Sequence, residues 1–305
     1  MHIPVLLNEV LQHLQPKDGE TYVDATFGAG GYTKAILNSA NCKVFSIDRD
    51  VAAIDVAKQV KNEYGERFEF LRGNFSEVKS LLQDQGVEKI DGIVFDLGVS
   101  SMQFDLMDRG FSFESDARLD MRMDQESDLS AYEVVNELEE DQLRTIIRDY
   151  SDERYARQIA KKIVNRREDK PVTSCRELAD IVRSCYGSKY QKIDPATRTF
   201  QAIRIYVNQE LHEISEALNE VKDVLESGAR LIVVSFHSLE DSIVKGFLKK
   251  EAGIDKTFSR YEPEVSQGKE VSFKIISKSA IKPSDEEVKQ NYRARSSKMR
   301  VGIKL

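Results

Sequence analysis

The sequence predicts an α/β protein in which a doubly wound, Rossmann-like parallel sheet carries an inserted, all-helical domain. Three observations predict this class. Short β-rich runs alternate with amphipathic helical stretches through the first hundred residues, the alternation stops after Asp96, and it resumes near Ala196. One α/β domain interrupted by a helical insert explains this rhythm better than two domains in series. We therefore expect a discontinuous domain at 1–105 and 197–305, and a helical domain at 106–196 that recognises the substrate.

The first hundred residues supply the parallel half of the sheet. Each predicted strand is followed closely by a helix, which favours right-handed crossovers. The predicted strands are Thr21–Thr26, Lys43–Asp48, Arg67–Arg72 and Ile90–Asp96. The predicted helices are Val5–Leu14, Tyr32–Asn38, Val51–Tyr64 and Phe75–Gln85.

After Asp96 the sequence predicts the helices of the insert, then a long helix, and then a further strand of the sheet. Within the insert we expect helices at Glu139–Tyr150, Glu153–Arg167 and Cys175–Tyr186. From Ala196 to Glu226 the apolar residues recur every three or four positions, which predicts one long helix. Gly228 then suits the C-cap of that helix, and the apolar run Ala229–Phe236 predicts a buried central strand.

Composition excludes several classes of protein. The 305 residues are 40% hydrophobic, so a core can form, and no apolar run approaches the roughly 18 residues that cross a bilayer. The N-terminus lacks a secretion signal, and three cysteines without C-x-x-C spacing suit a reducing cytoplasm. Four scattered histidines predict no metal site. The formal charge of -7 argues, at first, against a nucleic-acid partner.

A glycine-rich turn is the first motif with chemical meaning. The stretch Asp24–Tyr32 leaves a strand, passes three glycines and enters a helix, so a ligand can lie against bare backbone and the helix N-terminus. Asp48 ends the next strand, where a carboxylate accepts ribose hydroxyls. A dinucleotide fits poorly, because Thr33 stands where its fingerprint requires glycine. A nucleoside cofactor without a pyrophosphate, such as S-adenosylmethionine, fits better.

Three further strand ends carry polar or aromatic candidates. Phe75 follows the third strand and suits adenine stacking, although standing alone it is better explained as packing at a helix start. Asp96 emerges from an apolar strand at the carboxyl edge, a position suited to holding an amine. His237 ends the fifth strand, and Ser238 with Asp241 resembles a capping box for the next helix. Neither a hydrolase elbow nor a phosphate loop is present.

Long strings of residues in one order resemble the bacterial small-subunit rRNA (cytosine-N4)-methyltransferase family RsmH, formerly called MraW. The resemblance covers nearly the whole chain. The strings begin at His2, Tyr22, Asp96, Arg109, Leu119, Thr199, Ser235 and Arg293. The chain departs from the family pattern at Tyr32, Met102, 116–118 and 291–293.

The resemblance implies a Rossmann-like S-adenosylmethionine-dependent methyltransferase that methylates N4 of a cytidine in the P-site region of 16S rRNA. The implied partner is 16S rRNA within the small subunit or its precursor, with no membrane, and a homodimer stays open. The cofactor positions of the family fall on Gly30, Gly31, Tyr32, Asp48, Phe75, Asp96 and Gln103. We expect Asp96 to accept a hydrogen bond from the N4 amine, and the base pocket to be lined by Ser100, Ser101 and His237.

Two alternatives remain at this point: a non-catalytic RNA-binding assembly factor, and a methyltransferase that acts on a protein amide or small molecule. The glycine turn with Asp48 disfavours the first. The second gives no obvious reason for the helical insert or the basic C-terminal segment.

Local charge revises the inference from net charge. Residues 154–198 hold 12 basic and 5 acidic residues, and residues 278–304 hold 8 and 3, whereas 114–153 holds 4 and 14. An acidic protein with two basic segments can bind RNA, with marked sensitivity to salt. The cations that we expect to contact RNA are Arg157, Lys161, Arg293 and Arg295.

Overall fold

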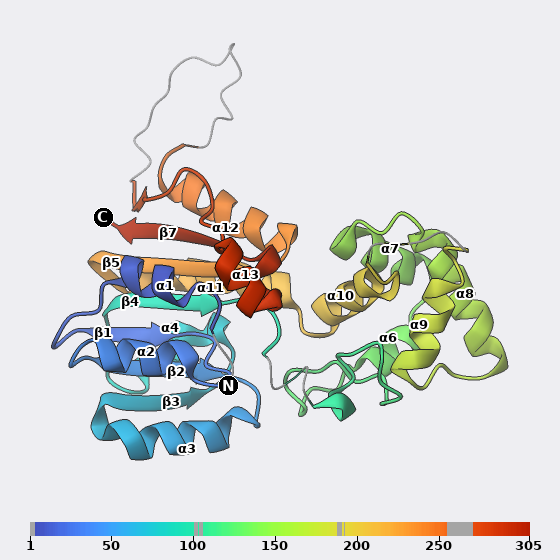
Figure 1. Ribbon diagram of the computed structural model, residues 1–305, viewed down its shortest axis with the longest axis horizontal. Helices are drawn as coiled ribbons and strands as arrows, with labels where there is room; N and C mark the ends of the chain where they lie inside the picture. Colours follow the sequence, from blue (N-terminus) through green and yellow to red (C-terminus); the bar gives the residue numbers. More distant parts are fainter. Residues whose placement is uncertain (1–3, 101–102, 104–105, 188–190, 192, 255–270) are drawn as a thin grey trace, which may run out of the picture. The chain divides into compact units, whose positions relative to one another are not determined.

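The structure, a computed structural model, describes residues 4–100, 103, 106–187, 191, 193–254 and 271–305. The chain divides into two compact units (Figure 1). The first unit joins Met1–Gly98 to Leu211–Leu305, and the second spans Val99–Glu210. Among the described residues, no helix combines the length and the apolar character needed to span a bilayer.

The first unit is built on a seven-stranded sheet in the order β3-β2-β1-β4-β5-β7-β6 (Figure 1). Strands β1 to β5 run parallel to one another, whereas β7 is antiparallel to both β5 and β6. The order reverses between β1 and β4, and in such sheets ligands bind beyond the carboxyl ends of the strands at that point. This topology confirms the predicted fold class. The strands are β1 (Thr21–Asp24), β2 (Lys43–Asp48), β3 (Phe68–Arg72), β4 (Ile90–Asp96), β5 (Leu225–Ser235), β6 (Phe273–Ile275) and β7 (Lys298–Lys304).

Helices cover both faces of this sheet, as expected for buried parallel strands. Alternate side chains of one strand enter opposite cores: Ile93 and Phe95 of β4 pack on one face, and Val94 on the other. The first face is covered by α4 (Val78–Gln83), α11 (Glu210–Val224) and α12 (Ser238–Glu251). The second is covered by α1 (Leu7–Leu14), α2 (Gly31–Ser39) and α3 (Ala53–Tyr64). The short elements are η1 (Gly65–Arg67), η2 (Phe75–Glu77), α13 (Asp285–Gln290) and η4 (Tyr292–Ser296).

The second unit is helical around a core of its own. Its helices present their apolar stripes to one cluster, which includes Leu143, Ile159, Leu178 and Ile203. Capping boxes fix the starts of three helices there: Ser130 with Glu133, Glu139 with Gln142, and Ser174 with Glu177. The elements are η3 (Met107–Arg109), α6 (Ala131–Glu137), α7 (Glu140–Ser151), α8 (Ala156–Asp169), α9 (Cys175–Arg183) and α10 (Ala196–Val207).

The single long helix predicted over Ala196–Glu226 is wrong. The segment forms two helices, α10 and α11, separated near Gln209, which adopts the left-handed conformation with φ 50°. The first belongs to the core of the second unit and most of the second to the core under the sheet. The apolar residues recur every three or four positions through both helices, so the sequence pattern does not show that the two helices pack in different cores.

Three smaller expectations about the chain after α10 also change. Gly228 is not a C-cap, because the strand β5 has already begun at Leu225 and Gly228 lies inside it with φ 88°. The helix after β5 is capped by His237 and Glu240 and not by Ser238 and Asp241. No strand was predicted beyond Phe236, yet β6 and β7 complete the sheet.

Candidate active site

The glycine turn lies between β1 and α2, at the reversal of strand order. Gly28 and Gly30 both have positive φ, of 50° and 73°, which glycine adopts without strain. At Gly31 a Cβ atom would stand 2.3 Å from Cγ of Pro4, so the residue must lack a side chain for the chain segment before α1 to pack there. The turn therefore brings bare backbone and the N-terminus of α2 to the carboxyl edge of the sheet.

A network of buried hydrogen bonds joins the glycine turn to strands β1 and β2. Asp24, fully buried at the end of β1, accepts hydrogen bonds from the backbone N–H (3.1 Å) and the hydroxyl (2.7 Å) of Thr33. The Thr33 hydroxyl also lies 2.7 Å from that of Ser46. Burial raises the pKa of Asp24 to about 6, against the opposing effect of these hydrogen bonds. Thr33 thus ties the first turn of α2 to β1, which explains a non-glycine residue at this position.

Tyr32 and Asp48 occupy the two sides of the turn. The Tyr32 side chain is buried and its hydroxyl donates to the carbonyl of Val5, so the side chain belongs to the core. Asp48 ends β2, where one carboxylate oxygen accepts the N–H of Gly28 at 2.8 Å and the other that of Asp50 at 2.9 Å. Asp48 therefore braces the glycine turn, and each oxygen keeps a second lone pair for a ligand.

Asp96 carries the most distinctive group of the site. It ends β4, and its backbone N–H donates to the Thr26 hydroxyl at 2.7 Å. Its Oδ1 atom is shielded from solvent and has no hydrogen-bond partner among the described residues. Burial, followed by the charges of Asp24 and Glu240, holds the pKa of Asp96 well above its usual range. Buried polar atoms rarely stay unpaired, so this oxygen calls for a donor from a ligand.

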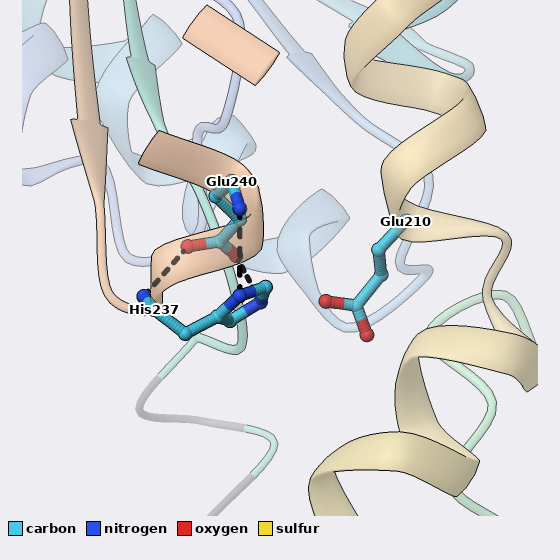
Figure 2. A group of neighbouring side chains, drawn as sticks. All are labelled: Glu210, His237 and Glu240. Carbon is cyan, nitrogen blue, oxygen red and sulfur yellow. Dashed lines mark hydrogen bonds and ion pairs between the residues drawn. The ribbon is translucent and has the colours of Figure 1, made fainter. Parts of the chain in front are cut away.

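His237 and Glu240 contact each other at the start of α12, just after the end of β5 (Figure 2). The fully buried Glu240 accepts the backbone N–H groups of Phe236 (2.7 Å) and His237 (3.1 Å) through one carboxylate oxygen. His237 Nε2 lies 3.0 Å from the other oxygen, and Nδ1 faces the N–H of Glu240 at 3.5 Å (Figure 2). Glu240 therefore fixes the loop that carries His237. Glu210, also drawn, is paired with Arg204 of the second unit at 2.8 Å.

Phe75 stands at the end of β3 on the same edge of the sheet. Its ring packs edge-on against Phe95 at 5.8 Å and joins the core beneath α4. The residue before it, Asn74, forms a capping box with Glu77. The packing explanation given above for Phe75 is therefore correct, and the half-exposed ring still offers a surface to a ligand.

The structure describes most of the remaining predicted residues within one unit or the other. Ser100 and Gln103 belong to the second unit, where they exchange hydrogen bonds of 2.9 and 3.3 Å, and Ser101 lies outside the described residues. Arg157 and Lys161 lie exposed on α8 of the second unit. In the first unit, Arg293 and Arg295 lie exposed on η4, where the Arg295 guanidinium covers the Tyr292 ring at 4.0 Å.

Sequence reasoning missed three residues that position this site: Asp24, Thr26 and Glu240. Asp24 opens the glycine motif, and its place at a strand end was the available signal. Thr26 lies two residues on and holds the backbone of Asp96. Glu240 stands three residues after His237, which is the spacing of a capping box. We predicted the cap at Ser238 instead, because serine is a commoner N-cap residue than histidine.

Comparison with known proteins gives this site a family. The model of the MraW methylase family matches residues 1–305, the whole chain. The chain belongs to the MraW methylase family. It is therefore an enzyme that transfers methyl groups, of the S-adenosylmethionine-dependent kind, as the sequence predicted.

Two named relatives are similar to this chain over nearly its full length. The "Ribosomal RNA small subunit methyltransferase H" of Rickettsia massiliae is 51% identical over 300 residues, covering 98% of this chain and 96% of that protein. The protein of the same name from Rickettsia felis is 50% identical over 305 residues, covering 100% and 98%.

Solved structures are more distant. An rRNA methylase from Streptococcus thermophilus gives a TM-score of 0.43 at 13% identity, covering 98% of this chain and 93% of that chain. A SAM-dependent O-methyltransferase from Thermotoga maritima gives 0.44 at 10% identity, covering 100% and 68%. Similarity at this level carries no argument about function.

Proposed function

We propose that this chain transfers a methyl group from S-adenosylmethionine to N4 of a cytidine in the P-site region of 16S rRNA. The observation that carries the proposal is the shielded Oδ1 of Asp96 at the carboxyl edge of the sheet, a hydrogen-bond acceptor to which no described residue donates. The relatives that share half of this sequence are named as small-subunit rRNA methyltransferases, which supports the RNA substrate.

The residues around the glycine turn fit the cofactor. The backbone of Gly30, Gly31 and Tyr32, at the N-terminus of α2, faces its amino-acid end with N–H groups. Asp48 keeps acceptor capacity for ribose hydroxyls, Phe75 offers a half-exposed ring to adenine, and Gln103 is assigned to cofactor binding. When bound, the cofactor supplies an electrophilic methyl group.

Asp96 acts on the substrate amine. The N4 lone pair is delocalised into the cytosine ring, so the amine is a weak nucleophile and most of the rate enhancement must come from positioning. The orphan oxygen of Asp96 accepts an N4 hydrogen bond and orients the lone pair toward the methyl group. As the bond from N4 to the methyl carbon formed, the carbon–sulfur bond of the cofactor would break and leave a neutral thioether, and the positive charge would pass to N4, where the buried carboxylate would stabilise it. The raised pKa of Asp96 suits it to receive the proton that the amine then loses.

The remaining predicted residues are assigned to the target base and the RNA. We assign binding of the target base to His237, which Glu240 holds, and to Ser100 and Ser101, and the base leaves its stack to reach them. The helical insert, 106–196, recognises the substrate, and Arg157, Lys161, Arg293 and Arg295 contact phosphates.

The test is methylation by the full-length chain. The protein is incubated with labelled S-adenosylmethionine and either small-subunit particles or naked 16S rRNA, and the modified nucleoside is mapped. We expect N4-methylcytidine at one P-site position, and a loss of at least about 100-fold in rate at saturating cofactor for Asp96→Asn. Label in protein and not in RNA, or near-normal turnover by the variant, would overturn the proposal.

A further inference from the structure

A cavity of about 590 Å³ lies in the first unit, away from the glycine turn. It is formed between the second half of α12 and the outer strands of the sheet, with Lys245, Phe273 and Arg300 among its lining. Its size falls in the roughly 300–1,000 Å³ range of sites that hold ligands of nucleotide size. Strand β6 lies at the edge of the described sheet, next to β7, and its three residues line one side of the cavity.

The floor of the cavity is apolar and firmly packed. Leu248 and Phe273 are buried there, and Phe273 packs edge-on against Phe247 at 5.6 Å. Gly302 of β7 makes this floor possible, since a Cβ atom at that position would stand 2.7 Å from Leu248 and 3.1 Å from Phe273. Around the floor, large apolar side chains stay exposed, which is unusual unless they meet a partner. They are Ile254 (51%), Val271 (46%) and Leu305 (55%).

The charged side chains described around the cavity are all cations. Among the described residues that line it there are four lysines and one arginine, and no Asp or Glu. Arg300 is committed to Asp241, with Nε 2.6 Å from Oδ1. The four lysines are exposed and take part in no ion pair among the described residues. They are Lys245, Lys249, Lys274 and Lys278.

We propose that this cavity is a second RNA-contact site, which takes an unpaired segment of the substrate RNA. This inference rests on the proposed function for the identity of the RNA. Lysine ammonium groups bind phosphates as point charges, and the exposed aliphatic side chains bury apolar surface of unpaired bases. In a chain of net charge -7, a cavity whose described charged side chains are all cations matches a polyanion.

RNA explains the lining better than an acidic protein segment does. The rim combines lysine point charges with exposed aliphatic side chains, so it selects for repeated negative charge beside apolar surface and reads no sequence. A substrate held at the carboxyl edge of the sheet must extend over the enzyme surface, and a second contact anchors it without touching the reacting base. The cavity therefore contributes to affinity for RNA and not to the chemical step.

The experiment compares two charge-matched double variants of the full-length chain. K245Q/K249Q removes two cavity lysines from exposed positions on α12. K43Q/K58Q removes two exposed lysines from β2 and α3, toward the opposite edge of the sheet. Binding of in vitro-transcribed 16S rRNA and of a short unstructured oligoribonucleotide is measured without cofactor, across a range of salt concentrations.

For K245Q/K249Q we expect the slope of log affinity against log salt to fall by about 1.4, since each single-strand phosphate contact contributes about 0.7. KM for small-subunit particles rises and kcat is unchanged, whereas K43Q/K58Q matches the wild type. Equal slopes for the two variants would overturn the inference, as would unchanged RNA binding combined with lost binding of a polyglutamate probe. Because RNA affinity is read without methyl transfer, a chain that binds RNA here but methylates none contradicts the proposed function alone.

Discussion

Replacing Gly31 by alanine tests whether the packing of the glycine turn, and not only its flexibility, is required. Gly31 begins α2 with an ordinary backbone conformation, so alanine adds no backbone strain there. The added Cβ, however, would stand 2.3 Å from Cγ of Pro4, where real contacts essentially never fall below 3.0 Å, so Pro4 must move by at least about 0.7 Å. Its neighbours resist that movement: the Val5 carbonyl accepts the Tyr32 hydroxyl, and the Leu6 N–H donates to Glu287 at 2.6 Å.

Overpacking of this kind costs about 1–3 kcal/mol, which for a unit of this size lowers Tm by about 2–12 °C. We expect cofactor affinity to fall as well, because the displaced segment borders the turn. The control is Gly246→Ala on α12, where no atom lies within 4 Å of the new Cβ, and which should gain about 0.5–1 kcal/mol. Thermal unfolding and calorimetric titration with S-adenosylmethionine measure both effects. A Gly31→Ala protein as stable as the wild type, beside a stabilised Gly246→Ala protein, would refute the reasoning.

Three further predictions concern charge. The folded-state pKa of Asp24 is raised from 3.8 to about 6, so its contribution to stability is fully present below pH 3.8 and is lost as the pH rises through 6. Between pH 7 and pH 3.5 the unfolding free energy of the wild type should gain about 3 kcal/mol relative to Asp24→Asn, measured by urea titration at each pH, and a constant difference would contradict it. Asp48→Asn leaves one of two backbone N–H groups without an acceptor and should weaken cofactor binding about 10- to 100-fold in calorimetry, whereas unchanged affinity would remove Asp48 from the site. Neutralising four arginines and lysines should weaken RNA binding and flatten its salt dependence with cofactor affinity unchanged, and an unaltered salt slope would exclude them as phosphate contacts. These four are Arg157, Lys161, Arg293 and Arg295.

The parallel half of the sheet was predictable because each element is local. β2 and β4 have the bounds that the sequence predicts, since each is an apolar run closed by an aspartate that emerges at the sheet edge. The same aspartates, Asp48 and Asp96, could be proposed as site residues because parallel strands bring their carboxyl ends to one edge. That Oδ1 of Asp96 accepts no hydrogen bond from the part of the chain that the structure describes could not be predicted, because it depends on where the donors lie after folding.

What the sequence did not reveal depends on contacts far apart in the chain. β6 is three residues long and has no pattern of its own, and it exists only because β7 offers an edge. The break between α10 and α11 needs Gln209 in a left-handed conformation, which costs about 1 kcal/mol or more and persists because each helix buries its apolar face in a different core.

The number of basic residues in a segment likewise does not show which of them can bind RNA. Residues 278–304 count as a basic segment, but part of that segment is the strand β7, in which Met299 and Val301 are buried and Arg300 and Lys298 both pair with Asp241. A count of charges cannot separate cations that neutralise a carboxylate inside the fold from cations that face solvent. Phosphate binding responds only to the second kind. The exposed cations of this segment lie outside β7, and it is their removal, not a change in net charge, that should alter the salt dependence of binding. They are Lys278 beside the cavity, Lys282, Lys289 on α13, and Arg293 and Arg295 on η4.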